Sequence, residues 1–353
     1  MSANRTIEQT NTAAKPCYLL AIETSCDETS AAVVEQGTII RSNIVSSQME
    51  THRRFGGVVP EVASRKHVET MTRMIEEALA EANVRPDELS AIAVTHGPGL
   101  VGSLLVGMVA AKALAVALDL PLIGVHHIAG HIYANQLVQP LQYPLISLVV
   151  SGGHTEIVHV EREGCFRILG QTRDDAVGEA FDKVARALQL PYPGGPHIDR
   201  LAGEAEQAIT LPRAWLEPGS YDFSFSGLKS AVLAALNQAK MKGIPLEAAH
   251  VARGFQESAV EVLVEKAIRA ANETGAKQLL LAGGVAANRG LRQALTARCE
   301  EEGIPLLIPP LDLCTDNAAM IGAAAYLKYT RGQFDSLELK AQALLSLEEW
   351  SVG

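Results

Sequence analysis

The sequence predicts an α/β protein made of two similar halves around a central cleft. Two observations predict this fold class. Apolar runs of strand length alternate with stripes at helical spacing, and the order strand, turn, strand, strand, helix, strand, turn, helix, strand occurs twice. The composition agrees, because 353 residues suffice for two domains and a hydrophobic content of 48% with 20% charged residues excludes a disordered or fibrous chain.

The first half is expected over residues 18–143, after a flexible extension over residues 1–17. Its strands are predicted at residues 18–23, 30–35, 38–45, 91–95 and 121–125. A helical stripe precedes the fourth strand; its apolar members are Met71, Met74, Ile75, Ala78, Leu79 and Ala82. Residues 100–118 form the most membrane-like stretch. It carries Lys112 and starts at a glycine turn, which favours a buried helix over a membrane span.

The second half is expected over residues 144–331, followed by a C-terminal tail over residues 332–353. Its strands are predicted at residues 145–150, 155–160, 166–169, 278–281 and 304–308. One helix carries an apolar stripe formed by Val260, Leu263, Val264, Ala267, Ile268 and Ala271. A second helix spans residues 288–302, after the Gly283-Gly284 turn. Residues from about 174 to 250 are an insertion that begins as a helix.

A duplicated order of this kind is typical of the actin, Hsp70 and sugar-kinase superfamily, in which tight turns at strand ends point into the cleft. A pair of Rossmann-like domains is the alternative. The G-x-G-x-x-G fingerprint is absent after the first strand, which weakens that alternative.

The charge balance excludes binding of nucleic acid by bulk charge alone, because 30 Lys and Arg against 40 Asp and Glu give a net charge of −10. The best local basic patch for a polyanion lies at residues 52–54 and 65–67. The alternative interpretation is that these residues form an ordinary solvated face. Five scattered cysteines without a CxxC pair indicate neither a zinc ribbon nor a disulfide framework. Residues 1–16 lack an apolar core typical of signal peptides, so a cytoplasmic location is expected.

A pair of histidines gives the sharpest metal signal. His127 and His131 are four residues apart, so on a helix they share one face and can bind one ion. Ile128 stands where a zincin protease carries its glutamate base, which weakens a protease mechanism. Asp316 is a candidate third ligand from a distant segment; its alternative role is to cap the helix that follows it.

Two glycine turns are candidate substrate sites. Ser151-Gly152-Gly153-His154 can present backbone N–H groups to an acyl or phosphate group, or be an ordinary hairpin turn. The Gly283-Gly284 turn opens a helix whose N-terminus can bind phosphate. Asn288 either caps that helix or binds a ribose or base. We expect the two turns to lie on different halves and to face one groove.

Acidic residues near the insertion have two interpretations. Asp182 lies in an acidic segment at a helix start, where it is either solvated or a hydrogen-bond acceptor for sugar hydroxyls. Residues 191–196 form a rigid turn, which Asp199 follows closely.

Nine motifs then carry a family resemblance. They are the His127/His131 pair and residues 22–29, 56–61, 97–102, 150–155, 178–183, 223–229, 283–289 and 314–320. Together they resemble the bacterial branch of the TsaD/Gcp/Kae-type family, the tRNA N(6)-adenosine threonylcarbamoyltransferases once named O-sialoglycoprotein endopeptidases. The resemblance runs from about Tyr18 to Arg331. Gln189 departs from it, because glycine is usual there.

The resemblance implies an actin-like ATPase fold and a transfer reaction. The threonylcarbamoyl group passes from threonylcarbamoyl-AMP to the N(6) amine of adenine-37 in tRNAs that read ANN codons. The resemblance further implies that His127, His131 and Asp316 hold one Fe²⁺ or Zn²⁺ ion, and that an adenine nucleotide (threonylcarbamoyl-AMP, or ATP or ADP) binds. The implied substrate-binding residues are Val149, Val150, Ser151, Gly152, Gly153, Asp182, Gly195, Asp199 and Asn288. The implied partners are tRNA, a paralogous actin-like subunit (TsaB) and a P-loop ATPase (TsaE), with no membrane.

The reaction also needs a group that accepts the proton of the attacking amine. Asp27, or less favourably Glu28, projects from the first hairpin turn and can serve as this base. Two other functions stay open at this point: a metalloprotease, and a small-molecule kinase of the same fold.

Overall fold

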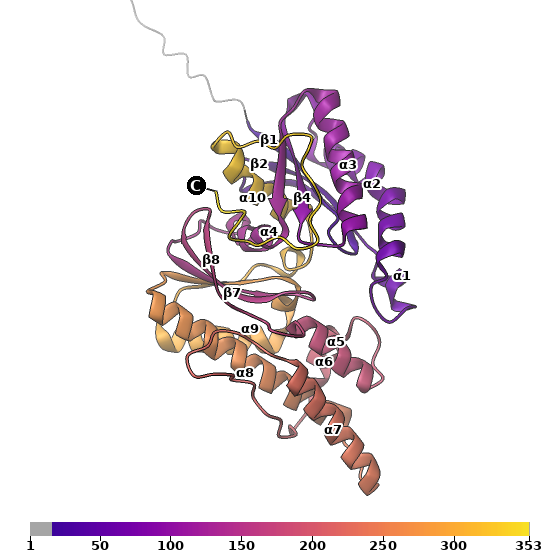
Figure 1. Cartoon of the computed structure of the whole chain (residues 1–353), viewed down its shortest axis with the longest axis vertical. Helices are drawn as coiled ribbons and strands as arrows, with labels where there is room; N and C mark the ends of the chain where they lie inside the picture. The colour runs from indigo at the N-terminus through magenta and orange to yellow at the C-terminus, as the bar shows by residue number, and fades with distance from the viewer. Residues whose placement is uncertain (1–15, 353) are drawn as a thin grey trace, which may run out of the picture.

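Two five-stranded sheets with the same topology form the structure. The computed structural model describes residues 16–352, so residues 1–15 of the expected extension lie outside the described residues. The strand orders are β3-β2-β1-β4-β5 and β8-β7-β6-β9-β10, and Figure 1 shows the two sheets one above the other. In each sheet an antiparallel hairpin continues into parallel strands. The predicted duplication is confirmed.

The first half contains five strands, four α-helices and two 3₁₀ helices. The strands are β1 (Tyr18–Glu23), β2 (Glu28–Glu35), β3 (Ile39–Ser47), β4 (Leu89–Gly97) and β5 (Leu122–His126). The helices are α1 (Met49–Arg53), α2 (Pro60–Ala82), η1 (Pro86–Glu88), α3 (Val101–Leu118), α4 (His127–Tyr133) and η2 (Ala134–Leu137).

The second half follows the same plan with a helical insertion. Its strands are β6 (Leu145–Val150), β7 (Thr155–Arg162), β8 (Cys165–Gln171), β9 (Gln278–Ala282) and β10 (Leu306–Leu307). Its helices are α5 (Val177–Ala187), α6 (Gly194–Glu204), α7 (Ser226–Lys242), α8 (Ala248–Thr274), η3 (Gly284–Ala287), α9 (Arg289–Glu302), η4 (Leu311–Leu313) and α10 (Ala318–Thr330). The closing strand is shorter than predicted because Pro305 and Pro309, which lack an N–H, flank it.

Strand alternation divides the core into three layers. In β1, Leu20 and Ile22 face α2 and α3, whereas Leu19 and Ala21 face the other way. That second face joins α4, α10 and the inner face of the second sheet in one continuous core. The outer face of the second sheet packs against α5, α8 and α9. The two halves therefore share a core rather than meeting only at a hinge.

Helix α10 comes late in the chain but packs on the first sheet. It contacts β1, β2 and β5, and it lies beside α4 (Figure 1). Gly130 of α4 permits this close approach, because a Cβ there would lie 2.8 Å from Cδ1 of Ile321 in α10. The acidic residue that precedes α10 is thereby brought next to the histidines of α4.

The C-terminal tail after α10 joins both halves. The Gln342 N–H donates to the carbonyl of His96 at the end of β4 (2.8 Å), and the Val352 N–H donates to the carbonyl of Gly164 in the β7–β8 turn (2.8 Å). Between them, the indole of Trp350 packs on Phe166 and donates to the carbonyl of Gly124 (3.1 Å). The tail thus lies across the junction of the halves.

Helix α3 is the described helix that is long and apolar enough to cross a membrane, with a mean hydropathy of 2.1. It packs against α2 and β4, as expected for a helix of an α/β domain. Its opposite face exposes an apolar stripe, formed by Val101, Leu105, Val109 and Val116. Val109 is 64% exposed, so this stripe is open to solvent over its middle.

Candidate metal centre and substrate cleft

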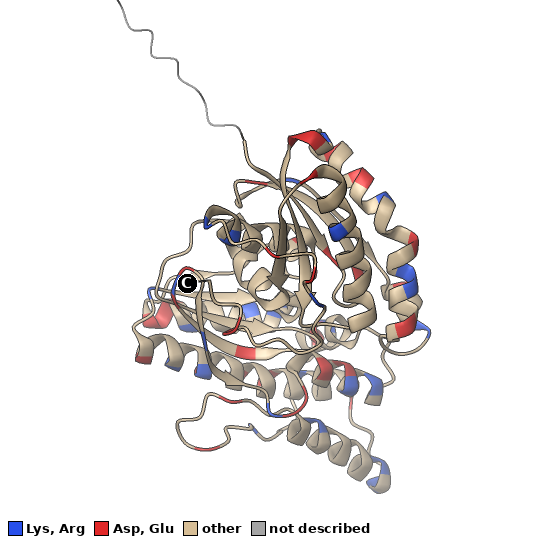
Figure 2. Ribbon diagram, turned by 45° about the horizontal axis from the view of Figure 1, so that its top comes forward, with Lys and Arg blue, Asp and Glu red and all other residues tan. Residues whose placement is uncertain are grey.

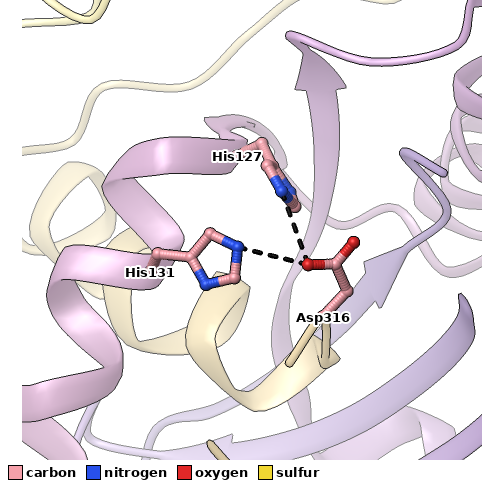
Figure 3. Close-up of side chains that lie close together, drawn as sticks. All are labelled: His127, His131 and Asp316. Carbon is pink, nitrogen blue, oxygen red and sulfur yellow. Dashed lines mark ion pairs between the residues drawn. The ribbon is translucent and has the colours of Figure 1, made fainter. Parts of the chain in front are cut away.

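Two histidines and an aspartate converge between α4 and α10. Nε2 of His131 lies 3.2 Å from Oδ1 of Asp316, and Nε2 of His127 lies 3.6 Å from the same oxygen. Figure 3 shows both imidazoles on one helix and the carboxylate at the start of the other. One candidate ligand atom from each residue lies within 4.8 Å of the others. The structure thus brings the three predicted ligands together.

The donor set fits a divalent metal ion. Two imidazoles and one carboxylate are ligands of Zn²⁺ and of Fe²⁺. His131 is 1% exposed; its Nε2 contacts only Asp316, and its Nδ1 makes no hydrogen bond within residues 16–352. A buried ring nitrogen without a partner is costly unless a further group satisfies it. These three residues can therefore hold a metal.

A buried glutamate fixes the orientation of one ligand. Nδ1 of His127 lies 3.2 Å from Oε2 of Glu23, the last residue of β1, which is fully buried. An ionised carboxylate only accepts, so Nδ1 carries the proton and Nε2 is left free to bind a metal. The same carboxylate accepts from the Thr95 hydroxyl (2.6 Å) and from the Ser25 N–H. Sequence reasoning missed Glu23, whose signal was a charged residue ending an otherwise apolar strand.

The electrostatics of the centre favour a positive charge. Burial opposes ionisation of His127, but Asp316 and Glu23 raise its pKa to about 9. Burial likewise opposes ionisation of Asp316, but the His127 and His131 imidazoles hold its pKa at about 2. Two carboxylates around buried imidazoles thus stabilise one cation, either a proton on His127 or a metal ion that displaces it.

The Ser151–His154 turn projects from the β6–β7 hairpin. The Ser151 N–H donates to the His154 carbonyl (2.8 Å), and Ser151 Oγ accepts from the His154 N–H (3.0 Å). Within the described chain, the N–H groups of Gly152 and Gly153 make no hydrogen bond, and a Cβ on either glycine would meet no atom within 4 Å. Both glycines therefore present open backbone donors.

The two residues before this turn contribute no side chain to its surface. Val149 and Val150 are fully buried in β6, and their backbones pair with Glu156 and Thr155 of β7. A ligand at the turn could reach them only through the main chain.

The two glycine turns belong to the same half. β6 and β9 are parallel neighbours, so the 151–154 turn and the Gly283-Gly284 turn lie at adjacent strand ends of the second sheet. The packing is close, because a Cβ on Gly283, whose φ is +91°, would overlap the carbonyl of Val150. The expectation that the turns come from different halves is wrong, as the order of elements already implied.

Asp182 and Gly195 lie together at the α5–α6 connection. Oδ1 of Asp182 accepts from the Gly194 N–H (2.6 Å), and a Cβ on Gly195 would meet nothing within 4 Å. Burial raises the pKa of Asp182, although the Gly194 and Gly195 N–H groups oppose this shift. Asp182 thus holds the start of α6 and leaves open space at Gly195.

Asp199 and Asn288 are engaged within the protein. Asn288 caps α9, because its Oδ1 accepts from the Leu291 N–H (2.8 Å), while its Nδ2 donates to Oε1 of Gln256 (2.7 Å). Asp199 forms an ion pair with Arg289 (2.9 Å). Of the two interpretations of Asn288, the structure therefore supports the cap.

Asp27 and Glu28 lie at the β1–β2 turn of the first half. Both side chains are half-buried, and Oε1 of Glu28 accepts from the Ser47 hydroxyl (3.0 Å). Burial raises the pKa of Glu28 well above its usual value, and the charges of Asp27 and Asp316 add to the effect. The two acids thus form a close pair within electrostatic reach of the candidate metal ligand Asp316.

The predicted basic patch is largely paired. Arg53 donates from Nε to the Tyr192 carbonyl of the second half (3.1 Å) and pairs with Glu50. Arg65 and Lys66 also pair with glutamates on α2. Figure 2 shows acidic and basic residues interspersed along the helices. The described surface around residues 52–67 therefore carries both acidic and basic side chains, and Arg54 is exposed on it.

The fold and the triad define the chain as a two-domain protein of the actin-like class with a candidate metal centre between its halves. The family model described as TsaD, tRNA N6-adenosine threonylcarbamoyltransferase, matches residues 39–323. The chain belongs to this family, whose members act on tRNA.

Close relatives agree over nearly the full length. The tRNA N6-adenosine threonylcarbamoyltransferase of Shouchella clausii is 62% identical over 332 residues, which is 94% of this chain and 99% of that protein. The protein of the same name from Geobacillus thermodenitrificans is 64% identical over 331 residues, or 94% of this chain and 97% of that protein. The transferase prediction is confirmed, and the protease and kinase alternatives find no support.

Solved structures of distant proteins share the fold. The (R)-2-hydroxyglutaryl-CoA dehydratase component A of Acidaminococcus fermentans has a TM-score of 0.54 at 16% identity, covering 89% of this chain and 99% of that one. HypF of T. kodakarensis has a TM-score of 0.59 at 14% identity, covering 93% of this chain and 51% of that one. At these identities the likeness concerns the fold alone.

Proposed function

We propose that the chain transfers the threonylcarbamoyl group of threonylcarbamoyl-AMP to the N(6) amine of adenine-37 in tRNAs that read ANN codons. The observation that carries this proposal is the convergence of His127, His131 and Asp316 between the two halves. A metal held by two neutral imidazoles and one carboxylate keeps open positions. Bound there as Fe²⁺ or Zn²⁺, it would act as a Lewis acid toward the carbamoyl carbonyl.

The protein's own groups supply the remaining chemistry. The open N–H groups of Gly152 and Gly153 can stabilise the oxyanion that develops when the amine attacks. Asp182 can bind ribose hydroxyls through the oxygen that does not hold Gly194, with the adenosine beside Gly195. Asp199 and Asn288 support this surface by fixing the first turn of α9, through the ion pair with Arg289 and the cap.

The amine proton goes to the Asp27/Glu28 pair. Burial and the nearby charges of Asp27 and Asp316 raise the pKa of Glu28, which favours proton uptake by this carboxyl group. The sequence favoured Asp27 as the base; the burial of Glu28 supports the pair acting together. Adenylate is a good leaving group, so an acid catalyst is less important on that side.

We propose three partners in the cytoplasm: tRNA, the paralogous actin-like subunit TsaB and the P-loop ATPase TsaE. The exposed apolar stripe of α3, centred on Leu105 and Val109, supports a protein contact with TsaB, because exposed apolar patches mark interaction surfaces. With a net charge of −10, binding of tRNA would rely on local cations such as Arg54 and on the partners.

Mass analysis of nucleosides tests the reaction. Unmodified tRNA is incubated with the metal-loaded protein, TsaB, TsaE, ATP and threonylcarbamoyl-AMP, and then digested. We expect threonylcarbamoyladenosine with the wild-type protein and none above background with His127→Ala, which should also lose its metal. A full metal complement in both His127→Ala and His131→Ala would refute the triad, and unmodified tRNA with the wild type would refute the reaction.

A further inference from the structure

A cavity that none of the site assignments uses lies where the two halves meet. It has a volume of about 460 Å³. His126 and Ile128, the neighbours of the ligand His127, line its first-half wall. Glu156 of β7 lines its second-half wall, and residues 345–348 of the tail close it. The cavity is therefore adjacent to the start of the metal-binding helix.

A second cavity extends this space to the glycine turn. It measures about 500 Å³, shares His154 and Glu156 with the first, and reaches Gly153. In the strand order β9-β6-β7-β8, Asn288 and the Gly283-Gly284 turn lie on the β9 side of the β6–β7 hairpin, whereas this groove lies on the β8 side. The groove and the residues proposed to bind threonylcarbamoyl-AMP thus lie on opposite sides of the same turn.

Glu156 has an unpaired carboxyl oxygen inside this groove. The residue is 9% exposed, and its Oε2 has no hydrogen-bond partner in the described part of the chain. Its neighbours on the same face of β7, Val158 and Val160, are apolar core residues. A buried polar atom without a partner costs free energy, so a carboxyl group at this place calls for an occupant that satisfies it.

We infer that this groove receives the acceptor adenine of the tRNA, and that Glu156 is a positioning residue that hydrogen bonds to a ring nitrogen beside the reactive amine. The inference rests on the transferase function proposed above. A base must leave the stack of the anticodon loop to be modified, and it then needs a pocket with apolar walls and a few polar groups. Ile128 and Leu345 supply such walls, while Glu156 supplies the polar group.

The chemistry of Glu156 suits this role. Burial raises its pKa to about 7, so the neutral carboxyl group is populated near neutral pH. A neutral carboxyl group donates one hydrogen bond and accepts another, which matches a purine edge with a ring-nitrogen acceptor next to an amine donor. A glutamine side chain offers the same pattern, whereas leucine of similar size offers neither.

Steady-state kinetics with tRNA as the varied substrate test the inference. The assay uses metal-loaded protein with TsaB and TsaE at saturating threonylcarbamoyl-AMP. We expect Glu156→Leu to raise the KM for tRNA about five- to tenfold, as for the loss of one hydrogen bond, and Glu156→Gln to stay within about twofold of wild type. Metal content and donor affinity should not change. Glu161→Leu, which alters an exposed carboxylate on the same strand, is the matched control.

Base analogues sharpen the test. Anticodon stem-loops that carry 1-deazaadenine or 7-deazaadenine at position 37 each lack one ring acceptor. If Glu156 donates a hydrogen bond to the missing ring nitrogen, the analogue should raise the KM of the wild-type protein for the stem-loop but leave the KM of Glu156→Leu unchanged. An unchanged KM for tRNA in Glu156→Leu overturns the inference, as does a loss of donor affinity instead, or an equal analogue effect in both proteins. Wild-type protein that makes no product would instead overturn the proposed function.

Discussion

Replacing Glu23 by glutamine should weaken metal binding without touching a ligand. Every polar neighbour of this carboxylate donates to it: the Ser25 N–H, the Thr95 hydroxyl and Nδ1 of His127. An amide has one oxygen and one NH₂ group, so at one position a donor would face a donor. If the NH₂ group faces His127, Nδ1 must accept, and the proton moves to Nε2, which then cannot bind a metal.

The magnitude follows from this geometry. Loss of the group that orients a metal-bound histidine costs about 10- to 100-fold in metal affinity. This corresponds to about 1.4–2.8 kcal/mol, which is also the scale of one buried donor left unsatisfied. Because all three ligands remain, binding should weaken rather than vanish.

Competition with a chromophoric chelator measures the affinity, and elemental analysis gives the metal content. Glu35→Gln, in the same hairpin but paired with Arg41, is the matched control and should bind metal like the wild type. A metal affinity of Glu23→Gln within twofold of wild type, with an unchanged thermal midpoint, would refute the orienting role of Glu23.

Three further predictions concern the turn, the partner surface and the backbone. Gly152→Val should abolish binding of threonylcarbamoyl-AMP in calorimetry while metal content stays normal, because a Cβ there meets no protein atom within 4 Å and the branched side chain would fill the space left for the ligand; normal affinity for threonylcarbamoyl-AMP would contradict the proposed site. Val109→Glu should prevent copurification with TsaB, leaving metal content unchanged, and intact copurification would place the contact elsewhere. Gln189 has a φ of +59°, so Gln189→Gly should raise the free energy of unfolding by about 0.5–1 kcal/mol; a decrease in denaturant titration would argue against strain there.

The duplicated fold could be predicted because short, local sequence patterns determine its helices and strands. Strand-length apolar runs and helical stripes repeat in order, and histidines four apart on a helix must share a face. Asp316 could be proposed but not assigned, since an acid before a helix is more often a cap. In the structure the cap is Asn317, whose side chain accepts from the Met320 N–H. This leaves Asp316 free to face the histidines.

The remaining site residues depend on contacts between distant segments. Glu23 and His127 are 104 positions apart and meet only because β5 and β1 flank β4 in the sheet. Glu156 looks like an ordinary polar position in an alternating strand, and only the sharing of a core between the halves makes it buried. The role of Asn288 was open because a cap and a ribose contact use the same amide oxygen.

The packing of α10 on the first sheet has a consequence for biosynthesis. A ribosome releases β1 to β5 long before residue 318 exists, so the face of the first sheet that α10 covers stays partly open until nearly all of the chain has been made. His127 and His131 likewise meet Asp316 only at that stage, so the candidate metal site is complete only when nearly the whole chain has been made.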